Sequence, residues 1–107
     1  MYIERKEDVT GGPARIGRVK FSQSGRSLYY RNLTLQKSKG GKKWNCFDVE
    51  SGDAYWVSGC KKNGGDRLYC GPVEIDDDVR EEYWVGIRKM PEKKAQRVIQ
   101  GTGKYTR

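Results

Sequence analysis

Histidine is absent from this sequence of 107 residues, and cysteine, proline and phenylalanine are scarce, with three, three and two copies. The lack of histidine removes the commonest general base and the commonest metal ligand of proteins. No apolar run approaches the ~18 residues that a membrane-spanning helix needs. Residues 1–6 also lack the apolar stretch of a secretory signal. We therefore predict a cytoplasmic protein that contacts no membrane.

The sequence contains many aromatic side chains for its length. Three Trp, seven Tyr and two Phe make up 11% of the chain, whereas all hydrophobic residues together reach 35% and charged residues 34%. A chain of this length forms one small domain with a thin core. Large aromatic rings must therefore supply much of the buried surface.

Charge is divided into three blocks along the chain. Residues 1–43 hold eleven Lys or Arg and three acids, residues 44–87 hold four bases and ten acids, and residues 88–107 hold seven bases and one acid. The net charge of +8 thus comes from two basic blocks around an acidic one. This division indicates an acidic partner, or a basic segment that contacts the protein's own acidic part. The third interpretation is that these charges are simply solvated.

Turn residues and short apolar stretches predict a mainly β (α+β) fold. The expected strands are Ala14–Phe21 with a bulge at Gly17, Ser27–Gln36 with a bend at Arg31–Asn32, Trp44–Val49, Ala54–Ser58, and Arg67–Cys70 with Val73–Ile75, broken at Gly71–Pro72. Two bent strands suit a small closed sheet. We predict an SH3-like bent-strand barrel closed by a C-terminal α-helix. The alternative architecture is an α+β sheet with the helix across one face.

The apolar period becomes helical after residue 75. Four apolar residues share one helical face: Val79, Tyr83, Trp84 and Ile87. This spacing predicts an α-helix over about 77–88, with Asp76–Asp78 supplying N-cap oxygens and negative charge at its start. A second short helix is predicted over Pro91–Gln100, because proline suits a first helical position. We therefore expect one domain over residues 1–90 and a basic, largely flexible tail over 91–107.

Three stretches resemble a family of small bacterial proteins of unknown function. They are GRVKFSQSGRSLYYRNLTLQ (17–36), FDVESGDAYWVSG (47–59) and DRLY with PVEIDDDVREEYW (66–69 and 72–84). The resemblance covers most of residues 1–90. It implies a single small domain and brings no established activity, cofactor or site residue with it.

No motif for catalysis, metal binding or cofactor binding is found. Cys60 and Cys70 flank the turn at residues 61–66, so a disulfide between them is geometrically conceivable. Three reduced thiols are the expectation in a cytosolic chain. Zinc is not predicted, because there is no C-x-x-C and no histidine. The segment from Gly40 to Lys43 departs from the phosphate-loop pattern. We predict neither an enzyme nor a cofactor.

Basic residues interleaved with aromatics form the most informative pattern. Single-stranded nucleic-acid binders stack bases on exposed aromatic rings and neutralise phosphates with Lys and Arg, although in a small domain most such rings belong to the core. The candidate polyanion-binding residues are Arg26, Arg31, Lys37, Lys39, Lys42, Lys43, Lys93, Lys94 and Arg97. We predict a non-enzymatic binding module for nucleic acid or another polyanion. The alternative is a protein-interaction domain that docks a charged protein partner.

Overall fold

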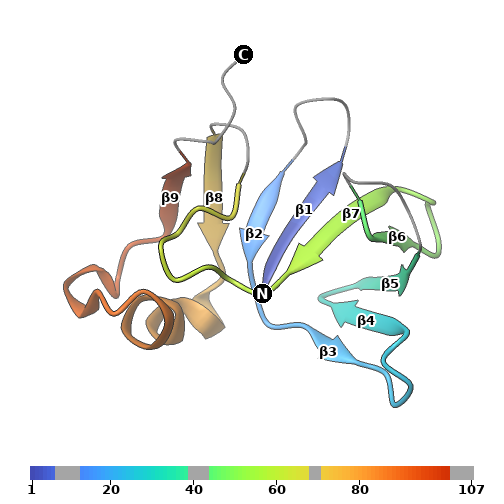
Figure 1. The fold of residues 1–107 in the computed structure, drawn as a ribbon, viewed down its shortest axis with the longest axis horizontal. Helices are drawn as coiled ribbons and strands as arrows, with labels where there is room; N and C mark the ends of the chain where they lie inside the picture. The colour runs from blue at the N-terminus through green and yellow to red at the C-terminus, as the bar shows by residue number, and fades with distance from the viewer. Residues whose placement is uncertain (7–12, 39–43, 68–70, 102–107) are drawn as a thin grey trace.

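The computed structural model describes residues 1–6, 13–38, 44–67 and 71–101. These residues form one curled sheet of nine strands with short helical segments at one end (Figure 1). The strands are β1 (Tyr2–Lys6), β2 (Ala14–Ile16), β3 (Lys20–Phe21), β4 (Ser27–Tyr30), β5 (Leu33–Lys37), β6 (Cys46–Asp48), β7 (Ala54–Ser58), β8 (Gly71–Ile75) and β9 (Val98–Gly101). The helical segments are η1 (Asp77–Val79), η2 (Glu82–Ile87) and η3 (Pro91–Lys93).

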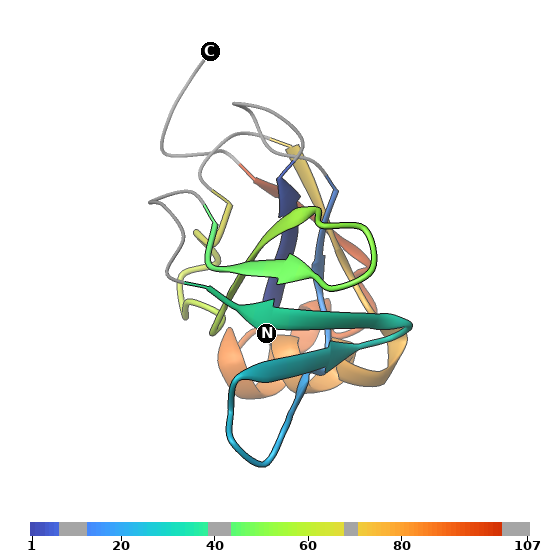
Figure 2. The same ribbon diagram turned by 90° about the vertical axis from the view of Figure 1, so that its right-hand side faces the viewer.

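The strand order confirms a mainly β fold. It runs β3-β4-β5-β6-β7-β1-β2-β8-β9, and the pairs between neighbouring strands are antiparallel except β2 with β8, which is parallel. The strands from β3 to β6 curl over, as Figure 2 shows, so that this part of the sheet forms a half-barrel. Strands β3 and β9 are the two edges of the sheet. The SH3-like identity stays a prediction.

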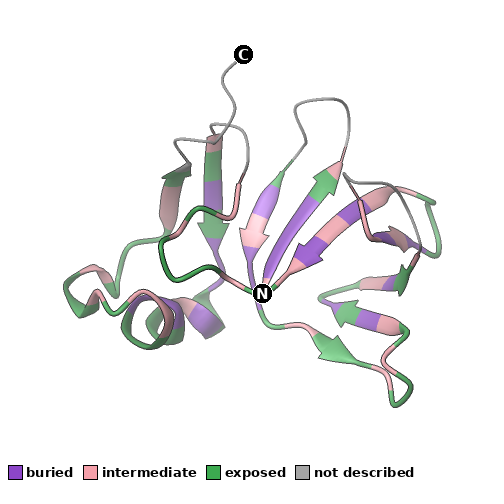
Figure 3. Cartoon of the chain, in the orientation of Figure 1, coloured by how far each residue is buried: buried purple, intermediate pink, exposed green. Residues whose placement is uncertain are grey.

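Two hydrophobic cores lie on opposite faces of this sheet. Buried positions occur along β1, β2, β7 and β8 (Figure 3). The helix-side core contains Tyr2, Ala14, Ile16, Val73, Ile75, Val79, Tyr83 and Trp84. The barrel-side core contains Ile3, Leu28, Tyr30, Leu35, Cys46, Tyr55 and Val57. Side chains alternate between the faces of a strand, so β1 sends Tyr2 into one core and Ile3 into the other. Strand β1 is therefore buried on both of its faces.

Two of the predicted strands are wrong in their connections. The expected strand Ala14–Phe21 ends at Ile16, and after three residues β3 pairs with β4 instead. The expected bent strand Ser27–Gln36 is a hairpin, in which Tyr30 lies opposite Leu33. The backbone reverses because Arg31 adopts a left-handed conformation with φ of 53°. The phase change in the sequence thus marks a chain reversal, where a bend was predicted.

Two other strands match the prediction more closely, and a third differs from it at one point. Strand β7 has the predicted bounds, Ala54–Ser58, and β6 occupies the middle of the expected strand Trp44–Val49. The predicted break at Gly71–Pro72 is wrong, since β8 includes both residues. Pro72 lies opposite Gln100 of β9, so its strand is covered on that side.

The predicted helix over 77–88 forms, but its geometry is not that of one α-helix. It begins as the 3-10 turn η1 and continues as the π-helical η2. Its predicted apolar face is confirmed, because Val79, Tyr83 and Trp84 are all buried. The indole Nε1 of Trp84 also donates a hydrogen bond to the carbonyl oxygen of Gln96 at 2.9 Å. In place of the predicted α-helix, the chain thus forms a short, irregular helical segment that packs against the helix-side core.

The predicted tail is in part a strand. Of the helix expected over Pro91–Gln100, only the turn η3 forms, and β9 follows it and pairs antiparallel with β8. A half-buried Ile99 packs against the helix-side core. The sheet extends to residue 101, so β9 lies within the predicted tail. The domain boundary at residue 90 stays a prediction. The expected disorder over 102–107 lies outside the described residues.

Candidate anion-binding site

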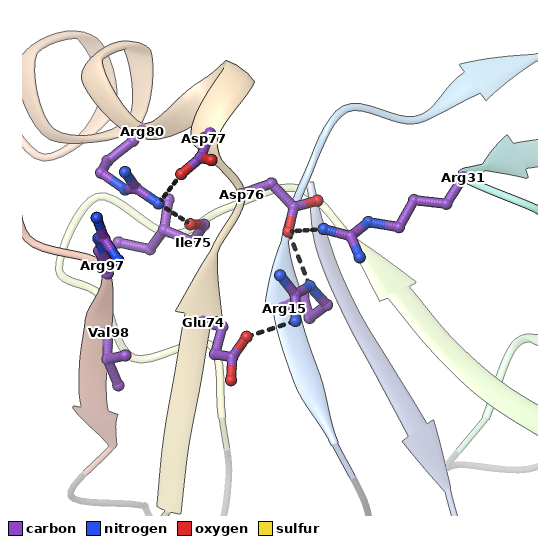
Figure 4. Close-up of a pocket in the computed structure, with 9 residues that line it drawn as sticks. All are labelled: Arg15, Arg31, Glu74, Ile75, Asp76, Asp77, Arg80, Arg97 and Val98. Carbon is purple, nitrogen blue, oxygen red and sulfur yellow. Dashed lines mark hydrogen bonds and ion pairs between the residues drawn. The ribbon is translucent and has the colours of Figure 1, made fainter.

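A buried aspartate holds three separate parts of the chain together. Asp76 follows β8 directly and is 7% exposed. Its Oδ2 accepts a hydrogen bond from the Tyr30 hydroxyl at 2.5 Å. Its Oδ1 accepts from Arg15 Nε at 2.7 Å and from Arg31 Nη2 at 2.9 Å (Figure 4). Asp76 was predicted to cap the helix, but its side chain makes no capping hydrogen bond. It faces the sheet because two guanidinium groups and a phenol there stabilise its charge.

The backbone around Asp76 is shaped for this contact. A Cβ atom on the buried Gly17 would overlap the Tyr30 ring and lie 2.6 Å from Asp76 Oδ2. Only glycine therefore allows the chain to pass so close to the carboxylate. Arg31 lies in the same region and has a φ of 53°. Residues other than Gly, Asn and Asp rarely adopt this backbone conformation. Strain of this kind persists where surrounding interactions impose it, and it concentrates at functional sites.

An open pocket of about 340 Å³ lies beside Asp76 and is lined by four arginines. We call it the arginine pocket. Its arginines come from β2, the β4–β5 turn, the end of η1 and the residue before β9: Arg15, Arg31, Arg80 and Arg97. Its acids are Glu74, Asp76 and Asp77. Four cations and three anions leave the arginine pocket with a net charge of +1.

The acids of the arginine pocket are all engaged. Arg15 Nη1 contacts Glu74 at 2.5 Å, and Arg80 pairs with Asp77. Arg80 also donates to the carbonyl oxygen of Ile75 at 3.0 Å. Its buried Nε finds no acceptor among the described residues. The exposed Arg97 has no side-chain partner in the part of the chain that the structure describes. The arginine pocket therefore offers spare donors, whereas each of its carboxylates already faces an arginine.

The protonation states fit this arrangement. Burial, reinforced by the hydrogen bond to Asp76, raises the pKa of Tyr30 to about 12, so its hydroxyl is a neutral donor. Burial alone lowers the pKa of the Arg15 guanidinium, but its hydrogen bond and charge interaction with Asp76 raise that pKa above its ordinary value. At neutral pH Arg15 stays charged, and the spare donors are those of cations.

The nine predicted polyanion-binding residues separate in space. Arg31 and Arg97, 66 positions apart in the sequence, meet at the arginine pocket. Arg26 and Lys37 lie opposite each other at the far end of the β4–β5 hairpin, where the Lys37 amide donates to the Arg26 carbonyl at 2.8 Å. Lys93 and Lys94 belong to the turn around η3, with Lys93 Nζ 5.5 Å from the Trp84 ring centroid. Lys39, Lys42 and Lys43 lie outside the described residues.

Sequence reasoning missed most of the arginine pocket. Arg15, Arg80 and Glu74 were not candidates, and Asp76 was assigned to helix capping. Arg15 is brought to Asp76 by the parallel pairing of β2 with β8, across 61 positions. The one available signal was the run Asp76–Asp78, which supplies more acids than one helix cap uses.

Within the described residues, no group of three or more His, Cys, Asp or Glu is placed to hold a metal ion. Cys46 and Cys60 are free thiols, whereas Cys70 lies outside the described residues. No helix in the described ranges is both long and apolar enough to cross a membrane.

Comparison of the chain with protein-family models, curated proteins and solved structures found no match. The resemblance of residues 17–36, 47–59, 66–69 and 72–84 to small bacterial proteins therefore stays a prediction.

Proposed function

We propose that this protein is a non-enzymatic binding domain for a polyanion, and that the arginine pocket receives one of its phosphate groups. The observation that carries the proposal is the meeting of Arg31 and the unpaired Arg97 at a pocket whose acids are already engaged. The planar fork of an arginine matches the geometry of phosphate oxygens. Nucleic acid is the polyanion that we favour, since its backbone presents a phosphate at every nucleotide.

Ion pairs within the protein indicate which cations remain for a ligand. Arg5 pairs with Asp53 at 3.1 Å, and Arg18 pairs with Glu82 at 3.1 Å. Together with Arg15 and Arg31, these arginines of the first basic block contact the acidic block. Ten described cations have no ion pair with a described residue: Lys20, Arg26, Lys37, Lys61, Lys62, Arg88, Lys89, Lys93, Lys94 and Arg97. Contact with the protein's own acidic part thus accounts for Arg5, Arg15, Arg18 and Arg31. The cations without an ion pair remain available to an acidic partner.

The SH3-like identity of the curled sheet remains part of this proposal. Small β-barrels bind oligonucleotides on curved sheet surfaces, and the half-barrel from β3 to β6 offers such a surface. A cytoplasmic location also remains a prediction.

Docking of a charged protein partner is the second candidate function. It is favoured by β9, an edge strand whose one strand partner among the described residues is β8. An edge strand leaves backbone donors and acceptors on one side for another chain to pair with. The mixed charges of the arginine pocket lie next to this edge, because Arg97 and Val98 line the pocket.

Titration of a labelled single-stranded oligonucleotide by fluorescence anisotropy, repeated over a range of salt concentrations, tests the proposed function. We expect binding at low salt whose log K falls linearly with log salt concentration. Arg97→Gln and Arg31→Gln should each weaken binding severalfold and reduce the salt slope by about one. The matched control is Lys62→Gln, an exposed cation in the 61–66 turn, which should change neither quantity. A flat titration at low salt, or equal effects of Arg97→Gln and Lys62→Gln, contradicts the proposal.

A further inference from the structure

A second hollow, of about 370 Å³, opens at the end of the half-barrel. We call it the Phe21 pocket. The side chains that matter for its chemistry are Phe21, Leu28, Lys37, Ser38, Asn45 and Cys46. Phe21 is 50% exposed, although its cross-strand partner Leu28 is 1% exposed. The domain thus leaves an aromatic ring half in solvent beside a hollow with an apolar floor.

The Phe21 ring has a cation on it. Lys37 Nζ lies 5.5 Å from the ring centroid, and Arg26 lies opposite Lys37 across the β4–β5 hairpin. Neither cation has an ion pair with a described residue. The side-chain amide of Asn45 is already used, because it donates to the Val57 carbonyl at 2.8 Å and accepts from the Val57 amide at 2.9 Å. The Phe21 pocket therefore presents an aromatic ring with two cations, Lys37 and Arg26, beside it.

The surrounding chain contains no acid that would repel an anion. No Asp or Glu occurs in residues 9–47, which hold nine Lys or Arg. The half-barrel strands β3, β4 and β5 all belong to this acid-free stretch. A ligand that suits both features must carry negative charge and also present a flat apolar face. Single-stranded nucleic acid has both, because its phosphates are anionic and its unpaired bases stack on aromatic rings.

We infer that the polyanion is a single-stranded nucleic acid, and that one of its bases enters the Phe21 pocket and stacks on Phe21. Phosphates next to that base lie over Arg26 and Lys37. This inference rests on the proposed function and adds the class of ligand to it. Arg31 lies in the β4–β5 turn and Lys37 ends β5, so the length of the hairpin, roughly 15 Å at the usual rise of a strand, separates them. A strand of the 4–16 nucleotides that small barrels cover therefore spans the Phe21 pocket and the arginine pocket.

The test compares three probes by competition in anisotropy: a single-stranded oligonucleotide, the duplex of the same sequence, and linear polyphosphate. Phe21→Ala should weaken single-strand binding by about fivefold or more, the loss expected for one stacked base. Phe21→Leu should lose a similar amount, since leucine keeps the apolar contact but has no ring. Polyphosphate binding should not change. The matched control is Val49→Ala, which truncates another exposed apolar side chain, 47% exposed, and should alter none of the affinities.

Two results separate this inference from the proposed function. Equal binding of single strand by the original protein and both Phe21 variants overturns the base site, as does duplex binding as tight as single-strand binding. In either case the polyanion function stands if the Arg97→Gln effect is present. Absence of binding to all three probes at low salt overturns both. Because Phe21 is half exposed, the variants should retain the melting temperature of the original protein, which checks that the fold is intact.

Discussion

The two ends of the sheet differ in charge and in the way they are covered. The basic arm, strands β3 to β6, has no acid before Asp48 and wraps around the barrel-side core. The acidic arm, β8 with η1 and η2, holds six acids and one base in residues 71–87 and packs its helical segments on the opposite face of the sheet. Charge that is segregated along the sequence is thus brought together in the fold. The arms meet at Asp76, an acid of one arm held by Tyr30 and Arg31 of the other.

The comparison also shows which arm depends on polar contacts. In the acidic arm, Trp84 is sealed into the core and its indole NH is satisfied. In the basic arm, the β4–β5 hairpin turns at Arg31, which has a left-handed backbone conformation. The exposed side chain of Arg31 pairs with Asp76. Removing buried apolar surface should therefore destabilise the acidic arm most. Removing charge should destabilise the junction between the two arms.

The largest effect is expected in the acidic arm. Trp84→Ala should lower the free energy of unfolding by about 3–5 kcal/mol, because it empties a fully buried position. The adjacent Val85 is 40% exposed, so Val85→Ala should change stability by less than about 0.5 kcal/mol. Chemical denaturation of both variants measures the difference. An unchanged stability of Trp84→Ala would show that the helical segment is not packed as described.

The junction between the arms should come next. Asp76→Asn should cost about 3 kcal/mol, because it leaves the guanidinium groups of Arg15 and Arg31 without their buried anion. The control is Asp78→Asn, whose exposed carboxylate lies 3.9 Å from Arg18 and should contribute little. If the two substitutions cost the same in urea denaturation, Asp76 does not hold the arms together.

Alkaline pH should probe the same junction through Tyr30. Its pKa is raised in the folded state to about 12 from 10, so folding stabilises the protonated phenol. That stabilisation is complete below pH 10 and is lost between pH 10 and pH 12, and it amounts to about 2–3 kcal/mol. Burial also raises the pKa of other tyrosines, so the measurement is the difference between the original protein and Tyr30→Phe. The variant should lose less stability over this range, and identical losses would refute the assignment.

The smallest of these effects tests how closely the chain passes Asp76. Gly17→Ala should cost about 1–3 kcal/mol, because its methyl group would overlap the Tyr30 ring. Gly59→Ala is the control, since a Cβ there meets no atom within 4 Å. Thermal melts of both proteins suffice. A Gly17→Ala protein as stable as the control would mean that Tyr30 and Asp76 are not in the described positions.

Local patterns predicted those parts of the fold that local physics determines. The alternation in Ala54–Ser58 and the helical spacing of Tyr83 and Trp84 were read correctly from the sequence. Strand β1 was not predicted, because burial on both faces removes the period of two. The reversal at Arg31 was read as a bend, since arginine is not a residue that usually signals a left-handed turn.

The candidate site was less accessible to sequence reasoning. Arg31 and Arg97 were identified from charge and neighbouring aromatics, but nothing local indicated that they line the same pocket. Asp76 contacts residues 45 to 61 positions away, so its partners depend on strand pairing. Runs of aspartate at the start of a helix usually cap it, and here the tertiary contact with two arginines prevailed.

Arginine side-chain NMR tests the central claim most directly. The Nε–H signals of the protein, assigned with single Arg→Gln variants, are followed while linear polyphosphate is added at low salt. The account predicts saturable shifts of the Arg31 and Arg97 signals, with Arg5, which pairs with Asp53 at a different place, remaining unchanged. Uniform, non-saturating shifts of all arginine signals, with Arg31 and Arg97 no different from Arg5, would contradict it.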